Sequence, residues 1–239
     1  MNAFATAHLP RSTEAGIRKV TRGIARRLVL STSGLAATEF ALMLPVLMSM
    51  GMYGAEIAYM TSVNMQVNQL AVSVADNASR LGQTDNSATT PTVTESDVDS
   101  VMQGALHQGE NIDFNERGRI ILSSFERDSA TNRQFIHWRR CSGELVEESE
   151  YGNATNRNGL TGAEIEAIGK PGKEVTVDVG LAVMFVEVYY RHEGIFGSMF
   201  IDDDVELKQE AAFLVRDDRN LMPTNQQGVT GTGGESHCT

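Results

Sequence analysis

The sequence contains few cysteines, few aromatic residues and none of the short motifs that mark common enzyme sites. Cys141 and Cys238 are the only cysteines in 239 residues, and Trp138 is the only tryptophan. Two distant cysteines with no CxxC pair and no histidine at metal-binding spacing do not form a zinc site. The sequence also contains no Walker loop, no GxGxxG, no GxSxG and no HExxH. We therefore expect no enzyme activity, no cofactor and no metal site.

Positive charge is scarce outside the N-terminal region. The chain has 20 basic and 31 acidic residues, and residues 1–33 contain six of the basic ones and one of the acidic ones. The rest of the chain therefore carries 14 basic and 30 acidic side chains. No stripe of lysine and arginine lies in this larger part, which argues against nucleic acid binding. A basic start before an apolar run is instead typical of a membrane protein whose first segment stays in the cytoplasm.

Residues 34–81 are predicted to form one long helix with two kinds of surface. Between residues 28 and 55 the only charged side chain is Glu39, and a membrane-spanning helix needs about 20 apolar residues. From residue 60 onward, apolar residues recur every three or four positions, which predicts one buried stripe. The stripe consists of Met60, Val63, Val67, Leu70, Val74, Ala78 and Leu81. The first half is thus suited to lipid and the second half to a folded partner, and we expect Glu56 to mark the outer interface of the membrane.

The start of the apolar run carries a short motif. Gly34 is followed by Leu35 and, five residues after the glycine, by Glu39 and Phe40, with the basic segment just before them. This arrangement resembles the processing site of type IV pilins and pseudopilins. The stretch LAATEFALMLPVLM resembles most closely the TadE-like proteins of tight-adherence (Tad) pilus systems, and HWRRCSGE and GLAVMFVEVYYRHEGIFGSMF resemble the body of the same family. Leu35 departs from the phenylalanine or methionine that pilins often have at this position.

The resemblance implies that a prepilin peptidase cuts between Gly34 and Leu35, and that Glu39 is the carboxylate used in assembly. It also implies a membrane-anchored, pseudopilin-like structural component of an adhesive pilus, whose partners are membrane lipid, pilin subunits and other pilus assembly proteins. Two other interpretations stay open. The chain can be an uncleaved single-pass anchor whose periplasmic domain binds secretion or surface partners. It can also be a secreted hydrolase that is cut after a signal peptide near residues 49–51.

The remaining sequence predicts an α+β fold, in which the long helix packs on a small antiparallel sheet of about four strands in a pilin-like arrangement. Thr94, with Asp97 three residues later, predicts the start of a short helix that runs to residue 107. The predicted strands are residues 117–127, 133–141, 174–191 and 205–216. Residues 142–173 are expected to form a long loop with a short helical turn near residues 163–168.

These expectations divide the chain into four parts. The parts are a basic cytoplasmic leader at 1–33, a transmembrane and amphipathic helix at 34–82, a periplasmic α+β domain at 83–219 and a flexible tail at 220–239. The predicted location is the bacterial inner membrane, crossed once, with the N-terminus in the cytoplasm. In an oxidising periplasm Cys141 and Cys238 can form a disulfide, and otherwise they are two free thiols. The aspartates at 202–204 are interpreted as a solvated turn rather than a cation site.

Overall fold

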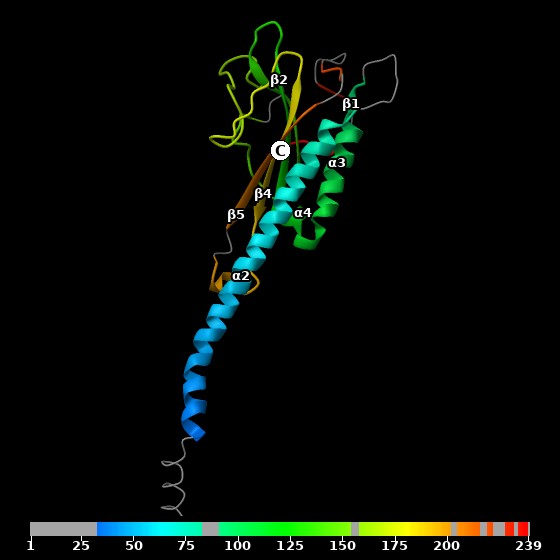
Figure 1. Cartoon of the computed structure of the whole chain (residues 1–239). Helices are drawn as coiled ribbons and strands as arrows, with labels where there is room; N and C mark the ends of the chain where they lie inside the picture. The colour runs from blue at the N-terminus through cyan, green and yellow to red at the C-terminus, as the bar shows by residue number, and fades with distance from the viewer. Residues whose placement is uncertain are drawn as a thin grey trace, which may run out of the picture. The chain divides into compact units, whose positions relative to one another are not determined.

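The computed structural model describes residues 33–82, 91–153, 158–201, 205–215, 219–221, 228–231 and 234–238. The predicted basic leader up to residue 32 and the aspartates at 202–204 lie outside this part of the chain. The chain divides into two compact units, with the boundary between Ala55 and Glu56. The first unit contributes an apolar helical segment, and the second contains the sheet and the other helices (Figure 1).

Helix α2 (Ser33–Ser79) is a single helix of 47 residues. Its bounds agree with the predicted helix to within two residues. In the second unit, five positions of the predicted apolar stripe are fully buried: Val63, Val67, Leu70, Val74 and Ala78. The two end positions of the stripe, Met60 and Leu81, are half-buried. The stripe prediction is confirmed, because side chains spaced three and four residues apart share one face of a helix.

The second unit contains a four-stranded antiparallel sheet with strand order β3-β2-β4-β5. Its strands are β2 (Gly118–Arg127), β3 (Gln134–Ser142), β4 (Ala182–Arg191) and β5 (Glu206–Leu214). Strands β2 and β3 form the predicted hairpin, whose turn is held by a hydrogen bond of 2.8 Å from the Thr131 amide to the Asp128 carboxylate. The α+β class and the small antiparallel sheet are confirmed.

Both faces of the sheet are covered. On one face, the sheet is covered by α2 and α3 (Glu95–Gln108) (Figure 1). These helices pack on apolar side chains of the strands, among them Ile120, Leu122 and Met184. On the other face, Ile168 and Val177, from the segment between β3 and β4, pack against apolar side chains of β2, β3 and β4. Because both faces are covered, these three strands are buried at nearly every position instead of at every second one.

Two predictions about the segments beside the sheet were wrong. The strand predicted from residue 174 begins only at Ala182. A turn precedes it, in which the Leu181 amide donates to the Asp178 carbonyl at 3.1 Å and Gly180 has a φ of +82°. No helical turn forms within the described residues 158–173, because Ile168 forms a β-bridge with Val175 and packs on the sheet.

Helix α3 begins where the sequence predicts. The Thr94 hydroxyl accepts a hydrogen bond of 3.2 Å from the Asp97 amide, and the Asp97 carboxylate accepts one of 2.9 Å from the Thr94 amide. This reciprocal pair satisfies two amides that a helix N-terminus otherwise leaves without a partner. After α3 come the short helices η1 (Glu110–Ile112) and α4 (Phe114–Arg117), which lead into β2, while η2 (Gly197–Met199) lies between β4 and β5.

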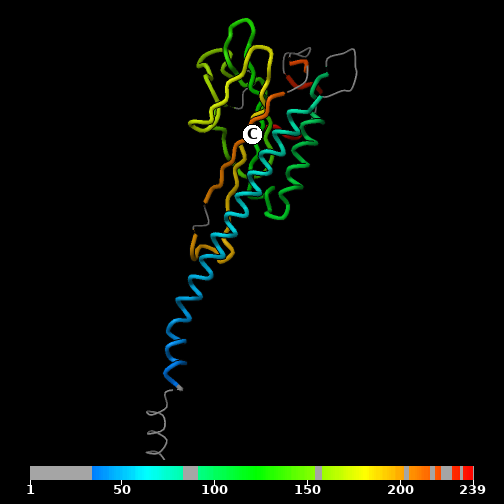
Figure 2. The backbone as a smooth tube through the Cα atoms, viewed as in Figure 1, coloured from blue at the N-terminus to red at the C-terminus, as the bar shows by residue number. Residues whose placement is uncertain are grey.

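Described residues of the predicted flexible tail, 228–231 and 234–238, contact the start of α3 and the strand before it. Strand β6 (Val229–Thr230) pairs in parallel with β1 (Val93–Thr94), just before α3. In Figure 2 the red part of the chain accordingly lies beside the start of α3. The Asp99 carboxylate of α3 accepts hydrogen bonds from the Ser236 hydroxyl at 2.6 Å and from the amides of Glu235 and Ser236. Burial raises the pKa of Asp99, but these hydrogen bonds outweigh burial and lower the pKa overall.

Candidate functional site

The first part of α2, residues 34–55, exposes apolar side chains on all sides. Its exposed large side chains are Leu35, Phe40, Leu42, Met43, Leu44, Val46, Leu47, Met48, Met50 and Tyr53. Within the described residues, α2 is the one helix long and apolar enough to span a membrane. Residues 35–55 would rise by about 30 Å, the thickness of a bilayer's hydrocarbon core. An apolar surface on every side of a helix calls for lipid or protein around it.

Gly34, Leu35 and Glu39 lie in the first turns of this segment. Glu39 is exposed and is its only charged side chain. Leu35 and Glu39 are four residues apart and therefore share one helix face. Thr38, beside Glu39, donates a hydrogen bond of 2.7 Å to the Leu35 carbonyl. A Cβ atom added to Gly34 would meet no other atom within 4 Å, so the described structure does not itself require glycine there.

Glu56, the second acid of α2, has a role that the sequence analysis missed. We expected it only to mark the outer interface, but its side chain is completely buried. Its two carboxylate oxygens accept hydrogen bonds from the amides of Ile195 and Phe196, at 3.0 and 3.1 Å. The sequence did hold an indication of this, because Glu56 precedes Met60 by four residues and so extends the apolar stripe by one position.

His192 and Gly194 complete the surroundings of Glu56. The His192 ring is buried, with its Nε2 atom 3.9 Å from Glu56 Oε1 and its ring 5.5 Å from that of Tyr59. Burial lowers the pKa of His192; Glu56 opposes this shift and Arg117 adds to it. A Cβ atom at Gly194 would lie 2.7 Å from Glu56 Oε1, so only glycine lets the loop backbone approach the carboxylate this closely.

Cys141 and Cys238 form a disulfide, with an S–S distance of 2.02 Å across a sequence separation of 97. It joins the end of β3 to the C-terminal region. Next to Cys141, the buried guanidinium of Arg140 pairs with the Glu95 carboxylate at the start of α3, with Nε donating to Oε2 at 2.9 Å. Together these links connect the sheet, α3 and the C-terminal region.

A cluster of charges lies around Lys208 on β5. Its ammonium group is 2.7 Å from a Glu150 oxygen, 2.9 Å from a Glu210 oxygen and 3.6 Å from a Glu187 oxygen. Burial lowers the pKa of Lys208, but the hydrogen bonds to Glu150 and Glu210 outweigh burial and raise it above its usual value. The ammonium group is held among three carboxylates of the same folded unit, which indicates a structural role.

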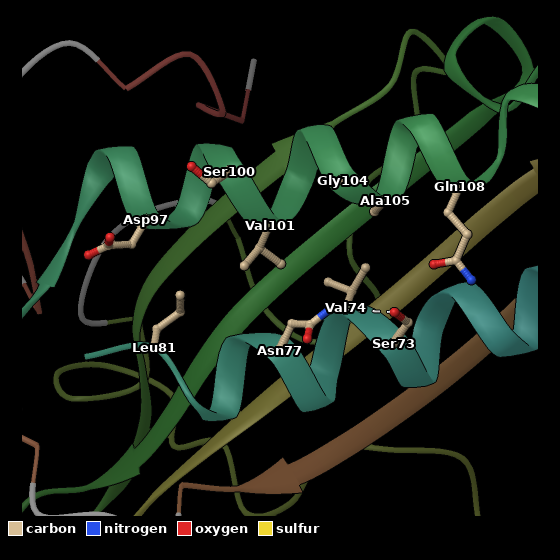
Figure 3. Close-up of a pocket in the computed structure, with 10 residues that line it drawn as sticks. All are labelled: Ser73, Val74, Asn77, Leu81, Asp97, Ser100, Val101, Gly104, Ala105 and Gln108. Atoms are coloured by element: carbon tan, nitrogen blue, oxygen red, sulfur yellow. Dashed lines mark hydrogen bonds between the residues drawn. The ribbon is translucent and has the colours of Figure 1, made fainter. Parts of the chain in front are cut away.

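A shallow cleft of about 460 Å³ lies between α2 and α3. Figure 3 shows Ser73 and Asn77 of α2 on one side and Ser100, Val101 and Gly104 of α3 on the other. The Asn77 amide donates to the Ser73 hydroxyl at 3.5 Å, so part of the polar lining is bonded within α2. No group of three histidine, cysteine or acidic side chains in the described residues could hold a metal ion.

Comparison of the chain with protein-family models, with curated proteins and with solved structures finds no match. The function is therefore inferred from features of this chain alone. They are an exposed apolar helical segment, a single carboxylate near the start of that segment, and a second carboxylate at its end that holds a loop of the folded unit.

Proposed function

We propose that this protein is a membrane-anchored, pseudopilin-like structural component for assembly of a Tad-type adhesive pilus. Residues 34–55 cross the bacterial inner membrane once, with the basic leader in the cytoplasm and the folded unit in the periplasm. A prepilin peptidase cuts between Gly34 and Leu35. The partners are membrane lipid, pilin subunits and other pilus assembly proteins, and the protein performs no catalysis.

The observation that carries this proposal is the placement of Glu39 in an otherwise apolar and exposed helical segment. A carboxylate inside a bilayer costs several kcal/mol unless a positive group compensates it. Cleavage after Gly34 creates an ammonium group at Leu35, one helical turn before Glu39. The ammonium group of the same chain or of a neighbouring subunit can then pair with the carboxylate. Such pairing between subunits would favour lateral assembly in one register.

Two substitutions test processing and assembly separately. We expect Gly34→Glu to block cleavage, because the peptidase needs close access to the backbone at this position. The described structure leaves room for a side chain at Gly34, so misfolding would not explain a block. We expect Glu39→Ala to leave a membrane-inserted protein that fails in pilus assembly. Mass spectrometry of the mature N-terminus, membrane fractionation and a piliation assay measure these outcomes.

The control for Glu39→Ala is Thr38→Ala, which alters the neighbouring exposed side chain without removing a charge. We expect normal piliation from this control. Normal pili with Glu39→Ala, together with a mature chain that still begins at Met1, would favour the uncleaved single-pass anchor that binds secretion or surface partners. A mature chain that begins after about residue 50 would instead identify a secreted protein.

A further inference from the structure

The loop between β4 and β5 exposes an apolar, uncharged surface. Residues 194–201, with the sequence GIFGSMFI, contain no charged side chain. Ile195 and Met199 are 54% and 70% exposed, and the Phe196 and Phe200 rings pack edge to face with centroids 6.1 Å apart. Ile195 and Met199 of this loop thus face outward, while Phe196, Phe200 and Ile201 are half-buried. Exposed apolar surface of this kind marks a contact with lipid or with another protein.

The loop is held in place by Glu56. Its backbone amides at Ile195 and Phe196 both donate to the Glu56 carboxylate, and Gly194 allows the close approach. At the other side, the His192 amide donates to the Val205 carbonyl at 2.9 Å. The backbone of the loop is therefore fixed by a charge-assisted pair of hydrogen bonds, which are stronger than neutral ones. Its exposed side chains are presented by a fixed support rather than by a free segment.

Glu56 follows directly after the apolar segment 34–55 in the chain. The amino acid that fixes the loop is thus the first one beyond the stretch that is long enough to cross a bilayer. If residues 34–55 span the membrane, the bilayer surface lies at the level of Glu56 and of the loop bound to it. Aromatic and apolar side chains at that level are suited to the zone between headgroups and acyl chains.

We propose that residues 194–201 insert into the outer interface of the bilayer as a second membrane contact, and that Glu56 positions them there. This inference rests on the membrane anchoring in the proposed function. The occupant is lipid rather than an acidic or basic partner, because the loop itself carries no charge. Glu193 precedes the loop, and Asp202, Asp203 and Asp204 follow it in the sequence. The local charge is therefore negative, and anionic lipid will not strengthen the contact.

The test places a tryptophan in the loop. Full-length Met199→Trp protein is reconstituted into phosphatidylcholine vesicles with and without brominated acyl chains, which quench nearby tryptophan. The spectrum of the parent protein is subtracted, since Trp138 is buried in the core of every variant. We expect the added emission to be blue-shifted and to be lost for the most part in brominated lipid. Vesicles that contain anionic phosphatidylglycerol should give the same result.

The matched control is Val179→Trp. Val179 is 50% exposed and precedes β4, whereas the loop follows β4, so about 30 Å of strand separates the two positions. Its emission should stay red-shifted and should not be quenched. Ile195→Trp provides a second loop position, for which we expect the behaviour of Met199→Trp.

Three results would overturn the inference. If the protein floats with vesicles but neither loop position is quenched, the proposed lipid contact of the loop is refuted and the proposed membrane anchor is not. A blue shift that grows with the ratio of protein to lipid, without quenching, would show that the loop contacts a second copy of the chain instead of lipid. If the parent protein does not float with vesicles, both the proposed membrane anchoring and the proposed loop contact are refuted.

Discussion

At the scale of single residues, the two glutamates of α2 have opposite environments. Glu39 is exposed in an apolar segment, whereas Glu56 is buried and accepts two backbone hydrogen bonds. Glu39 could be singled out from the sequence because it interrupts an apolar run. The role of Glu56 could not be predicted in full, because its donors lie about 140 residues further along the chain and a local pattern cannot show them.

This contrast gives a prediction at the residue scale. Glu56→Ala leaves two amides without their acceptor, and one hydrogen bond to a charged group contributes about 1.5–3 kcal/mol. We expect the free energy of unfolding to fall by about 3 kcal/mol, and by about half as much with Glu56→Gln, which keeps one acceptor oxygen. Urea unfolding of the full chain in detergent, followed by Trp138 emission, measures both. The matched control is Glu39→Ala, in the same helix but exposed, for which we expect no change in this transition. Equal stability of Glu56→Ala and the parent protein would contradict the structural role.

At the scale of elements, the sequence predicted those whose pattern is local. The stripe on α2, the capping box of α3 and the β2–β3 hairpin each follow from residues a few positions apart. The misplaced start of β4 has a physical cause. Val175, Val177 and Val179 alternate as in a strand, but Val177 packs onto the face of the sheet and Val179 is exposed before a glycine turn. Alternation cannot distinguish a strand from a loop that buries every second side chain.

The contacts made by the described residues of the C-terminal region could not be predicted, for a related reason. Its sequence is rich in glycine and polar residues, which locally favours a flexible tail. The contacts that hold its described residues come from distant partners, namely β1, Asp99 and Cys141. Such contacts leave no periodic pattern in the segment itself, so only the pairing of the two cysteines could be anticipated.

The disulfide supports a prediction at this scale. Closing a loop of 97 residues stabilises a protein by about 4 kcal/mol in the chain-entropy model. We expect Cys238→Ser to lower the free energy of unfolding by up to about this amount. Cys141→Ser should have a similar effect, and the double variant should add little to either single one, because all three remove the same bond. Two reactive thiols in the unreduced parent protein, measured by alkylation and mass spectrometry, would refute the pairing.

At the scale of the whole molecule, charge and hydropathy are distributed in sequence order. A basic leader comes first, an apolar segment with one carboxylate follows, and an acidic folded unit with a disulfide comes last. Each part fits a different environment: basic segments beside a span remain in the cytoplasm, apolar helices reside in lipid, and disulfides persist in oxidising compartments. These three preferences favour the same orientation.

The final prediction concerns this orientation. A phosphatase that is active only in the periplasm, fused after Gly82, should be active, and a fluorescent protein that matures only in the cytoplasm should be dark at the same position. The control is a fusion after residue 33, which lacks the apolar segment and should give the reverse pattern. If the basic residues of the leader set the orientation, replacing Arg18, Lys19, Arg22, Arg26 and Arg27 by glutamate should lower phosphatase activity of the Gly82 fusion. If the Gly82 fusion fluoresces and has no phosphatase activity, the folded unit faces the cytoplasm. That orientation would be inconsistent with the proposed cleavage between Gly34 and Leu35. It would also be inconsistent with an oxidising environment for Cys141 and Cys238.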